Sequence, residues 1–374
     1  MKLSILSENI QKKLSFVNHA VSAKSQLPIL LNFLLVARAG KLTIMATDLE
    51  IGIITGIPAS IEDEGAITIP AKLFLELINS ITADKITLEQ KEKNLHIQSG
   101  NIQSVLQTID AAEFPKLFEE KGNKQVVLKK ESIEKEWSKV VFAASPDSSR
   151  PALSGVLLKL ADTASQPGLL LVATDGYRLS LKSIPTQEKT PMKMEKPIIV
   201  PSRVIRELLT LKEEGEEVEL FLLEQGNQVM FTQGDTMVVG RLIEAQFPNY
   251  QKIIPSEFAT QVSFDREEMQ KAAKVCAIFA RESANIIKWS IEKGKIIVSA
   301  NSPSVGENRV EVEAKVSGEE NEIAFNSRYL LDLLGTINDE IMVFEMTGPL
   351  NPGVFKIQND NSFLHIIMPI RVQG

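Results

Sequence analysis

The residues of this chain best suited to acid–base or metal chemistry are three carboxylates. Asp48 and Glu50 follow a short apolar run, and Asp175 follows a similar run further along the chain. Paired acids can transfer protons or hold a metal ion. However, Asp48 and Asp175 occupy the same place in two copies of one pattern, and a third copy has Asn301 there. Because Asp and Asn both bond to the backbone of turns, this exchange favours a turn or capping role.

The remaining reactive residues form no recognisable site. His19, His96 and His365 are far apart and lack metal-ligand spacing. The sequence contains neither a Gly-x-x-x-x-Gly-Lys-[Ser/Thr] loop nor a Gly-x-Ser-x-Gly elbow. The single cysteine, Cys276, lies on the apolar face of a predicted helix, which indicates a buried structural thiol. We therefore predict no catalytic residue, no metal site and no cofactor.

The elements that would position these residues recur three times. Apolar residues with the spacing i, i+4, i+7, i+11 form a stripe along one face of a helix. The first set is Ile10, Leu14, Val17 and Val21, the second is Ile133, Trp137, Val140 and Ala144, and the third is Met269, Ala273, Cys276 and Ala280. Each set predicts the first helix of one repeat.

Two further markers follow these helices in the same order. Ala46, Ala173 and Ala300 lie 127 residues apart, each after a strand-like run. A short segment then precedes a second helix that carries an acid. The segments are Ile69-Pro70-Ala71-Lys72, Val200-Pro201-Ser202-Arg203 and Phe325-Asn326-Ser327-Arg328, and the acids are Glu76, Glu207 and Asp332. Three markers at one period indicate a triplicated domain, with predicted limits 1–124, 125–255 and 256–374.

Each copy combines two helices with about six strands. The strands predicted in the first copy are 31–38, 42–47, 50–57, 85–89, 94–98 and 104–109, and those in the second are 154–160, 169–174, 178–184, 217–223, 228–232 and 237–243. The third copy ends in a strand-like run, 365–372. Short strands joined by turns form hairpins, so we predict an α+β fold with antiparallel sheets and helices packed on one face.

Composition and charge narrow the functional classes. With 44% hydrophobic and 24% charged residues, the chain is typical of a globular protein. The longest apolar run, 27–37, is interrupted by Pro28 and Asn32, and the N-terminus is too polar for a signal peptide, so we predict a cytoplasmic protein that does not engage a membrane. The net charge is −7, yet the six predicted helices (8–24, 70–81, 129–144, 201–212, 265–281 and 326–337) sum to +6, which leaves −13 elsewhere. Basic helices in an acidic protein are typical of a surface that faces a polyanion.

Six motifs, taken in order, carry a family resemblance. They are Leu27-Pro28-Ile29-Leu30, Ala46-Thr47-Asp48-Leu49-Glu50, Arg150-Pro151-Ala152-Leu153-Ser154-Gly155, Ala173-Thr174-Asp175-Gly176-Tyr177-Arg178-Leu179, Phe247-Pro248-Asn249-Tyr250 and Met368-Pro369-Ile370-Arg371-Val372. Over its whole length the chain resembles the bacterial sliding clamp, the β subunit of DNA polymerase III. The resemblance implies three clamp domains per chain and a head-to-tail homodimer that closes into a ring around double-stranded DNA, without sequence preference.

The resemblance also implies a pocket between the second and third domains for a short apolar peptide. Its partners would be the polymerase III catalytic subunit, the clamp loader, and other replication and repair proteins. The matching residues are Leu153, Thr174, Gly176, Tyr177, Arg178, Leu179, Pro248, Lys252, Ile253, Val354, Ile366, Met368, Pro369, Ile370, Arg371 and Val372. Apolar walls with a few donors suit such a peptide. The alternative is that Met368, Ile370 and Val372 only pack a terminal strand.

Two further sets of residues match family positions. Lys24, Lys72, Arg150 and Arg203 match residues that contact DNA phosphates, and Leu106, Ile278 and Phe279 match the places where two chains meet. The family often has aromatic or polar residues where this chain has Pro151-Ala152, which weakens any stacking contact to DNA there. Gln373-Gly374 extend past the usual family end at Val372.

Two other functions compete with a DNA-encircling processivity factor. One is a metal-dependent hydrolase or nuclease that uses Asp48, Glu50 and Asp175. The other is a protein scaffold that never engages DNA, for which the basic helices would be dispensable. The first would require activity at the carboxylates, and the second would leave DNA unbound.

Overall fold

The computed structural model describes residues 1–22, 24–118, 122–161, 168–185, 194, 196–213, 215–223 and 226–371. The chain folds into two compact units. Of the described residues, those within 1–131 and 203–242 form unit 1, and those within 132–185, 194–202 and 243–371 form unit 2. The second repeat is therefore divided between the units.

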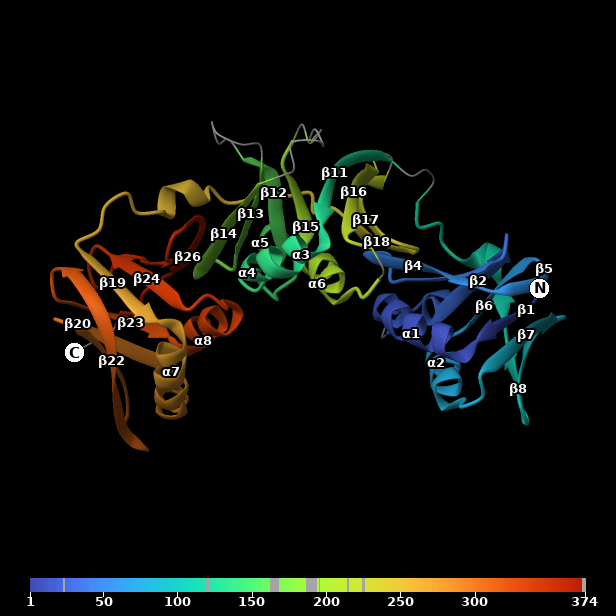
Figure 1. Cartoon of the computed structure of the whole chain (residues 1–374), viewed down its shortest axis with the longest axis horizontal. Helices are drawn as coiled ribbons and strands as arrows, with labels where there is room; N and C mark the ends of the chain where they lie inside the picture. Colours follow the sequence, from blue (N-terminus) through green and yellow to red (C-terminus); the bar gives the residue numbers. More distant parts are fainter. Residues whose placement is uncertain are drawn as a thin grey trace. The chain divides into compact units, whose positions relative to one another are not determined.

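Unit 1 contains two antiparallel sheets (Figure 1). The five-stranded sheet has the order β5 (Ser60–Asp63), β1 (Lys2–Leu6), β7 (Lys85–Lys91), β8 (Asn94–Ser99) and β9 (Ile102–Gln107). The nine-stranded sheet has the order β10 (Ile109–Asp110), β6 (Gly65–Pro70), β2 (Asn32–Arg38), β3 (Lys41–Thr47), β4 (Ile51–Pro58), β18 (Thr236–Arg241), β17 (Gln228–Gln233), β16 (Glu217–Leu223) and β11 (Asn123–Lys129). Because β4 pairs with β18, this sheet runs from the first repeat into the second.

The helices of unit 1 are amphipathic and cover its sheets. They are α1 (Ser7–Val17), α2 (Ala71–Ser80) and α6 (Ser202–Thr210), with the 3₁₀ turns η1 (Asn18–Ala20), η2 (Pro28–Leu31) and η3 (Ala111–Glu113). Helix α1 buries Ile10, Leu14 and Val17 and packs on β3 and β4. The Gln11 amide also donates to the Ile78 carbonyl, 2.8 Å away, which ties α1 to the end of α2. The apolar stripe thus faces the core.

Unit 2 is built on one continuous twelve-stranded antiparallel sheet (Figure 1). Its order is β15 (Ile198–Pro201), β12 (Gly155–Ala161), β13 (Gly168–Thr174), β14 (Arg178–Pro185), β26 (Asp360–Ile367), β25 (Gly353–Ile357), β24 (Ile341–Met346), β19 (Thr260–Asp265), β22 (Gly306–Gly318), β21 (Lys295–Ser302), β20 (Ile286–Glu292) and β23 (Asn321–Asn326). Here the β14–β26 pair joins the second repeat to the third.

Helices cover this sheet as well. In chain order they are α3 (Lys130–Ser132, whose first two residues belong to unit 1), the π-helical turn η4 (Ile133–Trp137), α4 (Ser138–Val141), α5 (Pro151–Ser154), the 3₁₀ turn η6 (Tyr250–Ile253), α7 (Arg266–Ala280) and α8 (Ser327–Thr336). Helix α7 packs on β20, β21, β22 and α8. Cys276 of α7 is fully buried, and burial raises the pKa of its thiol to about 11, as expected for a structural cysteine.

The predicted class is confirmed: the fold is α+β, with antiparallel sheets and two main helices per repeat. Predicted strands 217–223 and 178–184 match β16 and β14 within one residue. In the third repeat only a strand at 365–372 was predicted, and it overlaps β26 no further than Ile367. In the first two repeats, five strands were not predicted: β1, β5, β6, β11 and β15. All five lie at or next to a sheet edge, where alternation is weak because fewer side chains are buried.

Candidate functional site

The candidate site surrounds the strand pair that joins the second and third repeats. Residues Arg178–Lys182 of β14 lie antiparallel to Phe363–Ile367 of β26. Successive side chains of a strand point to opposite faces of the sheet. The pair therefore presents Leu179 and Leu181 on one face, and Arg178, Ser180 and Lys182 on the other.

Three predicted pocket residues meet on the first face. Leu179 is the cross-strand partner of Ile366, which is in turn the partner of Val354 on β25. All three are buried in one apolar cluster together with Tyr250. The segment that links the second and third repeats also packs on this cluster, through Ile243, Phe247 and Ile254. Predicted residues Pro248, Lys252 and Ile253 belong to the same linking segment and are exposed.

The turn before β14 brings further predicted residues to the same end of the strand pair. The Thr174 hydroxyl donates to the Arg178 carbonyl at 2.6 Å and accepts from the Gly176 N–H at 3.0 Å. Gly176 has φ +94°, a conformation that favours glycine. A Cβ at this glycine would lie 4.0 Å from Leu153 Cδ1, so Leu153 borders the turn.

Exposed apolar side chains gather at this end. Tyr177 is 59% exposed and Met368 is 37% exposed, and the Met368 N–H donates to the Tyr177 carbonyl at 2.8 Å. The Tyr177 ring stacks on that of Tyr329 from α8, with centroids 6.5 Å apart. Pro369 and Ile370 are half-buried and Arg371 is exposed, whereas Val372, like Gln373-Gly374, lies outside the described residues. An exposed apolar rim of this kind is typical of a binding surface.

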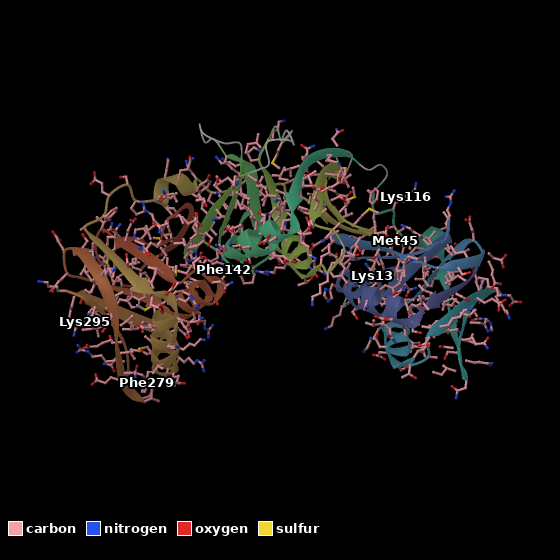
Figure 2. All side chains as sticks on the ribbon, viewed as in Figure 1. Lys13, Met45, Lys116, Phe142, Phe279 and Lys295 are labelled. Carbon is pink, nitrogen blue, oxygen red and sulfur yellow. The ribbon has the colours of Figure 1, made fainter. Side chains whose placement is uncertain are left out.

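Arg178 lies on the other face, away from the apolar cluster. Its guanidinium donates to Asp175 at 3.1 Å, to Asp332 of α8 at 2.6 Å and to the Phe142 carbonyl at 3.0 Å. It also lies over the rings of Tyr329 and Phe142. The structure therefore uses the Arg178 donors to fix α8 against β14. Phe142 is labelled in Figure 2.

Two buried lysines extend this polar face. Lys182 contacts Asp360 at 2.6 Å and Glu136 at 3.0 Å. Lys139 contacts Glu136 at 3.5 Å and Asp339 at 3.2 Å. Each lysine thus links Glu136 of the second repeat to an aspartate of the third. Burial acts to raise the pKa of Asp360, but hydrogen bonds from Lys182 and Ser362 outweigh it, so the net pKa is lowered.

His365 of β26 lies on the same face of the sheet, opposite Ser180 of β14. Its Nδ1 is 2.6 Å from the Ser180 hydroxyl, and its ring stacks on Phe142 with centroids 5.2 Å apart. Complete burial, together with the positive charge of Arg178, lowers the pKa of His365 to about 3. The imidazole is therefore neutral at physiological pH and acts as a packing and hydrogen-bonding group.

Comparison with known proteins identifies the family. Models of the N-terminal, central and C-terminal domains of the DNA polymerase III beta subunit match residues 1–118, 127–249 and 251–371. The "Beta sliding clamp" proteins of Synechococcus elongatus and Caulobacter vibrioides are 32% and 30% identical to this chain, with full coverage of both chains in each case. The chain belongs to the DNA polymerase III β-subunit family of sliding clamps. The crystal structure of the DNA polymerase sliding clamp from Bacillus subtilis superimposes with a TM-score of 0.93 at 26% identity, again over both full chains.

The four residues predicted to contact DNA differ in the ion pairs that they form within the chain. Lys24 and Lys72 are exposed, and the described part of the chain gives neither an ion pair. Arg150 is exposed, 3.4 Å from Asp147, and also donates to the Asp175 carbonyl. Arg203, in contrast, pairs with Asp48 and donates to the His19 carbonyl at 2.8 Å. The charge of Arg203 is therefore already balanced.

The residues predicted to join two clamp chains lie at opposite ends of the sequence. Leu106 is buried in β9, the edge strand of the five-stranded sheet. Ile278 is 61% exposed on α7, and Phe279 packs partly on the core of the third repeat. Figure 2 shows Phe279 near the end of α7.

Two of the three carboxylates weighed for catalysis, Asp48 and Asp175, cap turns. Asp48 Oδ1 accepts the N–H groups of Glu50 and Ile51, and Asp175 Oδ1 accepts those of Tyr177 and Arg178. The capping prediction is therefore confirmed for both aspartates. The third copy was assigned wrongly: Asn301 lies within β21, and the strand ends one residue later at Ser302. The described residues contain no group of three or more His, Cys, Asp or Glu side chains arranged to hold a metal ion, and no described helix is long and apolar enough to cross a membrane.

The sequence analysis missed three residues that the structure places beside predicted ones. Tyr329 stacks on Tyr177 and under Arg178. Leu350 lines a small surface hollow together with the predicted residue Ile370. Arg328 is exposed and occupies the second position of α8, the position that Lys72 holds in α2 and Arg203 holds in α6. The repeat could have revealed Arg328, whereas the other two depend on long-range contacts.

Proposed function

We propose that this chain is the processivity subunit of a bacterial replicative polymerase, a sliding clamp that encircles duplex DNA and tethers other proteins to it. The observation that carries this proposal is the full-length match, in sequence and in fold, to proteins named beta sliding clamp. The triplicated fold supports it, because similar units joined in series through heterologous contacts can close into a ring. Such a protein acts in the cytoplasm, where the bacterial chromosome lies.

The ring would consist of two chains, each with three clamp domains. We place the domain limits at 1–122, 123–255 and 256–374. The first boundary differs from the predicted residue 124 because β11 begins at Asn123. The interface would join β9, which carries Leu106, to the third domain near Ile278 and Phe279. Strand β9 supports this assignment because an edge strand offers unpaired backbone groups to a partner.

The dimer interface can be tested by truncating its apolar side chains. Replacing Ile278 and Phe279 together (Ile278→Ala with Phe279→Ala) should weaken the dimer by about 2–5 kcal/mol, because buried apolar area is lost. Size-exclusion chromatography with light scattering should then show monomers, while circular dichroism stays unchanged. Val305→Ala, at another exposed apolar side chain of the third repeat, is the matched control. A double variant that remains dimeric on dilution would refute the assignment.

DNA would be held by phosphate contacts that carry no sequence information. Lys24, Lys72 and Arg150 are exposed cations suited to this role, and Arg328 adds an equivalent position in the third repeat. Arg203 would contribute less, because its ion pair with Asp48 competes with a phosphate. Few and weak contacts allow the protein to slide along the duplex.

Partner proteins would bind at the exposed apolar rim of the β14–β26 pair. Tyr177, Met368 and Ile253 offer apolar surface to a Leu/Phe-bearing linear peptide, and Arg371 offers a donor beside them. The polymerase III catalytic subunit, the clamp loader, and other replication and repair proteins would compete for this site. The protein itself would be a non-catalytic subunit, which agrees with the capping roles of Asp48 and Asp175.

The ring mechanism predicts that DNA topology controls release. Once a cognate loader has placed the protein on nicked circular DNA, it should stay bound in salt that abolishes direct binding, because linkage prevents escape. Cutting the circle with a restriction enzyme should release it by sliding, and blocking both ends with bound protein should restore retention. Gel filtration of labelled protein with DNA measures each state.

Two outcomes would contradict this function. Equal release from circular and linear DNA would show binding by charge alone, as expected for a groove binder. No retention on either DNA, with an intact peptide interaction, would favour a scaffold that never engages DNA. A metal-dependent cleavage of DNA that is lost in Asp175→Asn would instead support the hydrolase alternative.

A further inference from the structure

A small hollow with mixed polar and apolar walls lies beside β23, the end strand of the twelve-stranded sheet. It has a volume of about 80 Å³ and is lined by Ile323, Ala324, Pro349, Leu350 and Ile370, with Lys288 and Glu322 at its polar border. Lys288 and Glu322 form an ion pair of 2.7 Å. The hollow shares Ile370 with the proposed partner pocket, so the two surfaces are continuous.

The backbone edge of β23 faces the same region. The Ile370 N–H donates to the Ala324 carbonyl at 2.8 Å, on the edge of β23 opposite to β20. The N–H and C=O of one strand residue point to the same edge, and this direction repeats every second residue. The Ala324 N–H and the Glu322 carbonyl therefore lie on this outer edge too. An edge with available donors and acceptors can accept an added strand.

The second repeat shows what covers the equivalent surface there. At β15, the Ile243 N–H donates to the Ile199 carbonyl at 2.9 Å, the same contact as that of Ile370 with Ala324. Ile199 and its cross-strand partner Leu157 are then packed by Tyr250, with Phe247 against the same cluster. An extended apolar segment of the chain itself thus occupies this place in the second repeat.

At β23 the corresponding cross-strand pair is Lys288 and Ala324, and the hollow lies beside it. The volume is far below the roughly 300–1,000 Å³ of a small-molecule site, but it suits one side chain of a bound peptide. Strand addition with a side chain in a neighbouring hollow is a common mode of peptide recognition.

We infer that the outer edge of β23 and its hollow form an accessory site for the flank of a clamp-binding peptide. The apolar anchor of the peptide occupies the rim at Tyr177 and Met368. The adjoining residues extend past Ile370, pair with the backbone at Ala324 and place one aliphatic or aromatic side chain against Leu350. This inference rests on the proposed partner pocket and deepens it.

Peptide length provides the test. The probes are a five-residue fluorescent peptide with the Leu/Phe anchor, and two longer peptides that add Ser-Val-Ser-Val at the amino or the carboxyl end. Fluorescence anisotropy on the full-length protein should show that one extension raises affinity about tenfold or more. Backbone N-methylation of the two added valines should remove the gain while the anchor still binds.

Variants of the protein locate the effect. Ala324→Val fills the hollow, and Leu350→Ser removes its exposed wall. With either variant, the long and short peptides should bind with equal affinity, so that the ratio of their affinities falls to about one. Val305→Ser changes an equally exposed apolar residue of the third repeat and should preserve that ratio. Because Leu350 is 56% exposed, its replacement should leave the fold intact.

The possible failures are distinguishable. If the short peptide binds but neither extension adds affinity, the accessory site is refuted and the proposed function stands. If an extension adds affinity that survives Ala324→Val, Leu350→Ser and N-methylation, the flank binds elsewhere and the inference is again refuted. If the short peptide fails to bind, both the pocket and its extension are refuted.

Discussion

The chain contains two strand junctions between repeats that share one backbone design. In unit 1, Ile51–Thr55 of β4 pair with Thr236–Gly240 of β18, and in unit 2, Arg178–Lys182 of β14 pair with Phe363–Ile367 of β26. The second junction is the first displaced by 127 residues in both strands. In each, an aspartate caps the preceding turn and an arginine donates to a carbonyl near the end of the repeat's first helix, at His19 or Phe142.

The two arginines come from different elements and differ in burial. At the β4–β18 junction, Arg203 reaches Asp48 from α6, and its side chain remains 43% exposed. At the β14–β26 junction, Arg178 comes from the strand itself, and its side chain is 9% exposed between Asp175 and Asp332. Lys182 adds a buried ion pair where the first junction has Thr55 bonded to Thr236. The second junction is therefore held by buried charge, and the first mainly by apolar packing and partly exposed pairs.

On the exposed rims of the two junctions the distribution of charge is reversed: the rim of the first junction is charged and that of the second is apolar. The backbone contact from Met368 to Tyr177 has its counterpart in the contact from Arg241 to Glu50, at 3.0 Å. Charged side chains thus replace exposed apolar ones. Gly52 stands where the second junction has Leu179, and a Cβ at Gly52 would lie 2.8 Å from Leu117 Cδ2. The comparison shows how one scaffold yields a surface closed by its own linking segment and another that leaves apolar groups exposed.

The buried arginine should contribute most to stability. Arg178→Met leaves the buried Asp175 without its ion pair, so we expect a loss of about 3–5 kcal/mol in unit 2. Both tryptophans of the chain, Trp137 and Trp289, lie in unit 2, so tryptophan fluorescence during urea unfolding reports on this unit. Coincident unfolding of variant and wild type would contradict the buried network.

The matched variant is Arg203→Met at the other junction. A partly exposed pair contributes about 0–1 kcal/mol, because solvent screens it. Hydrogen exchange of the Ile51–Thr55 strand should therefore change little, whereas exchange of Arg178–Lys182 in the Arg178 variant should rise strongly. Equal changes in both strands would remove the distinction between the junctions.

An effect of pH on stability is also expected, again at one junction only. The pKa of His365 is about 3 in the folded chain and about 6.5 when unfolded, so between these values the unfolded state binds the extra proton. Stability of unit 2 should be complete above pH 6.5 and decline by about 1.4 kcal/mol per pH unit as pH falls toward 3. His365→Phe should reduce this slope by about one proton in urea titrations followed by tryptophan fluorescence. The equivalent position in the first junction is Val238, which cannot titrate. An unchanged slope in the variant would show that His365 is not the group responsible.

Much of this architecture was predictable because each repeat is marked by patterns of residues that are close in sequence. The apolar stripes predicted α1, the helical segment around Trp137, and α7, and the Ala-Thr-Asp segments predicted the capped turns at Asp48 and Asp175. Helix ends were less predictable. The stripe through Val21 extended α1 too far, since the helix ends at Val17 and continues only as a 3₁₀ turn.

The candidate site was less predictable because it depends on distant partners. Arg178 matched a pocket residue by motif, yet the strand's alternation turns it away from Leu179 toward Asp332, 154 residues later. Similarly, Arg203 was predicted to be available for DNA, whereas in the structure it pairs with Asp48, which lies 155 residues earlier. Sequence spacing identifies the residues of a turn, but only tertiary structure decides which face and which counter-charge each side chain meets.

Hydrogen exchange with a bound peptide tests most directly the claim that one junction serves partners and the other does not. A Leu/Phe-bearing peptide from the replicative polymerase, added to the full-length protein, should protect amides in Tyr177–Lys182 and Phe363–Arg371. Exchange in Glu50–Thr55 and Thr236–Arg241 should remain unchanged. Replacing the exposed pair with its charged counterparts, Tyr177→Glu with Met368→Arg, should lower affinity about 100-fold, close to 2.7 kcal/mol, and abolish the protection. Protection at the β4–β18 junction, or equal protection at both, would contradict the account.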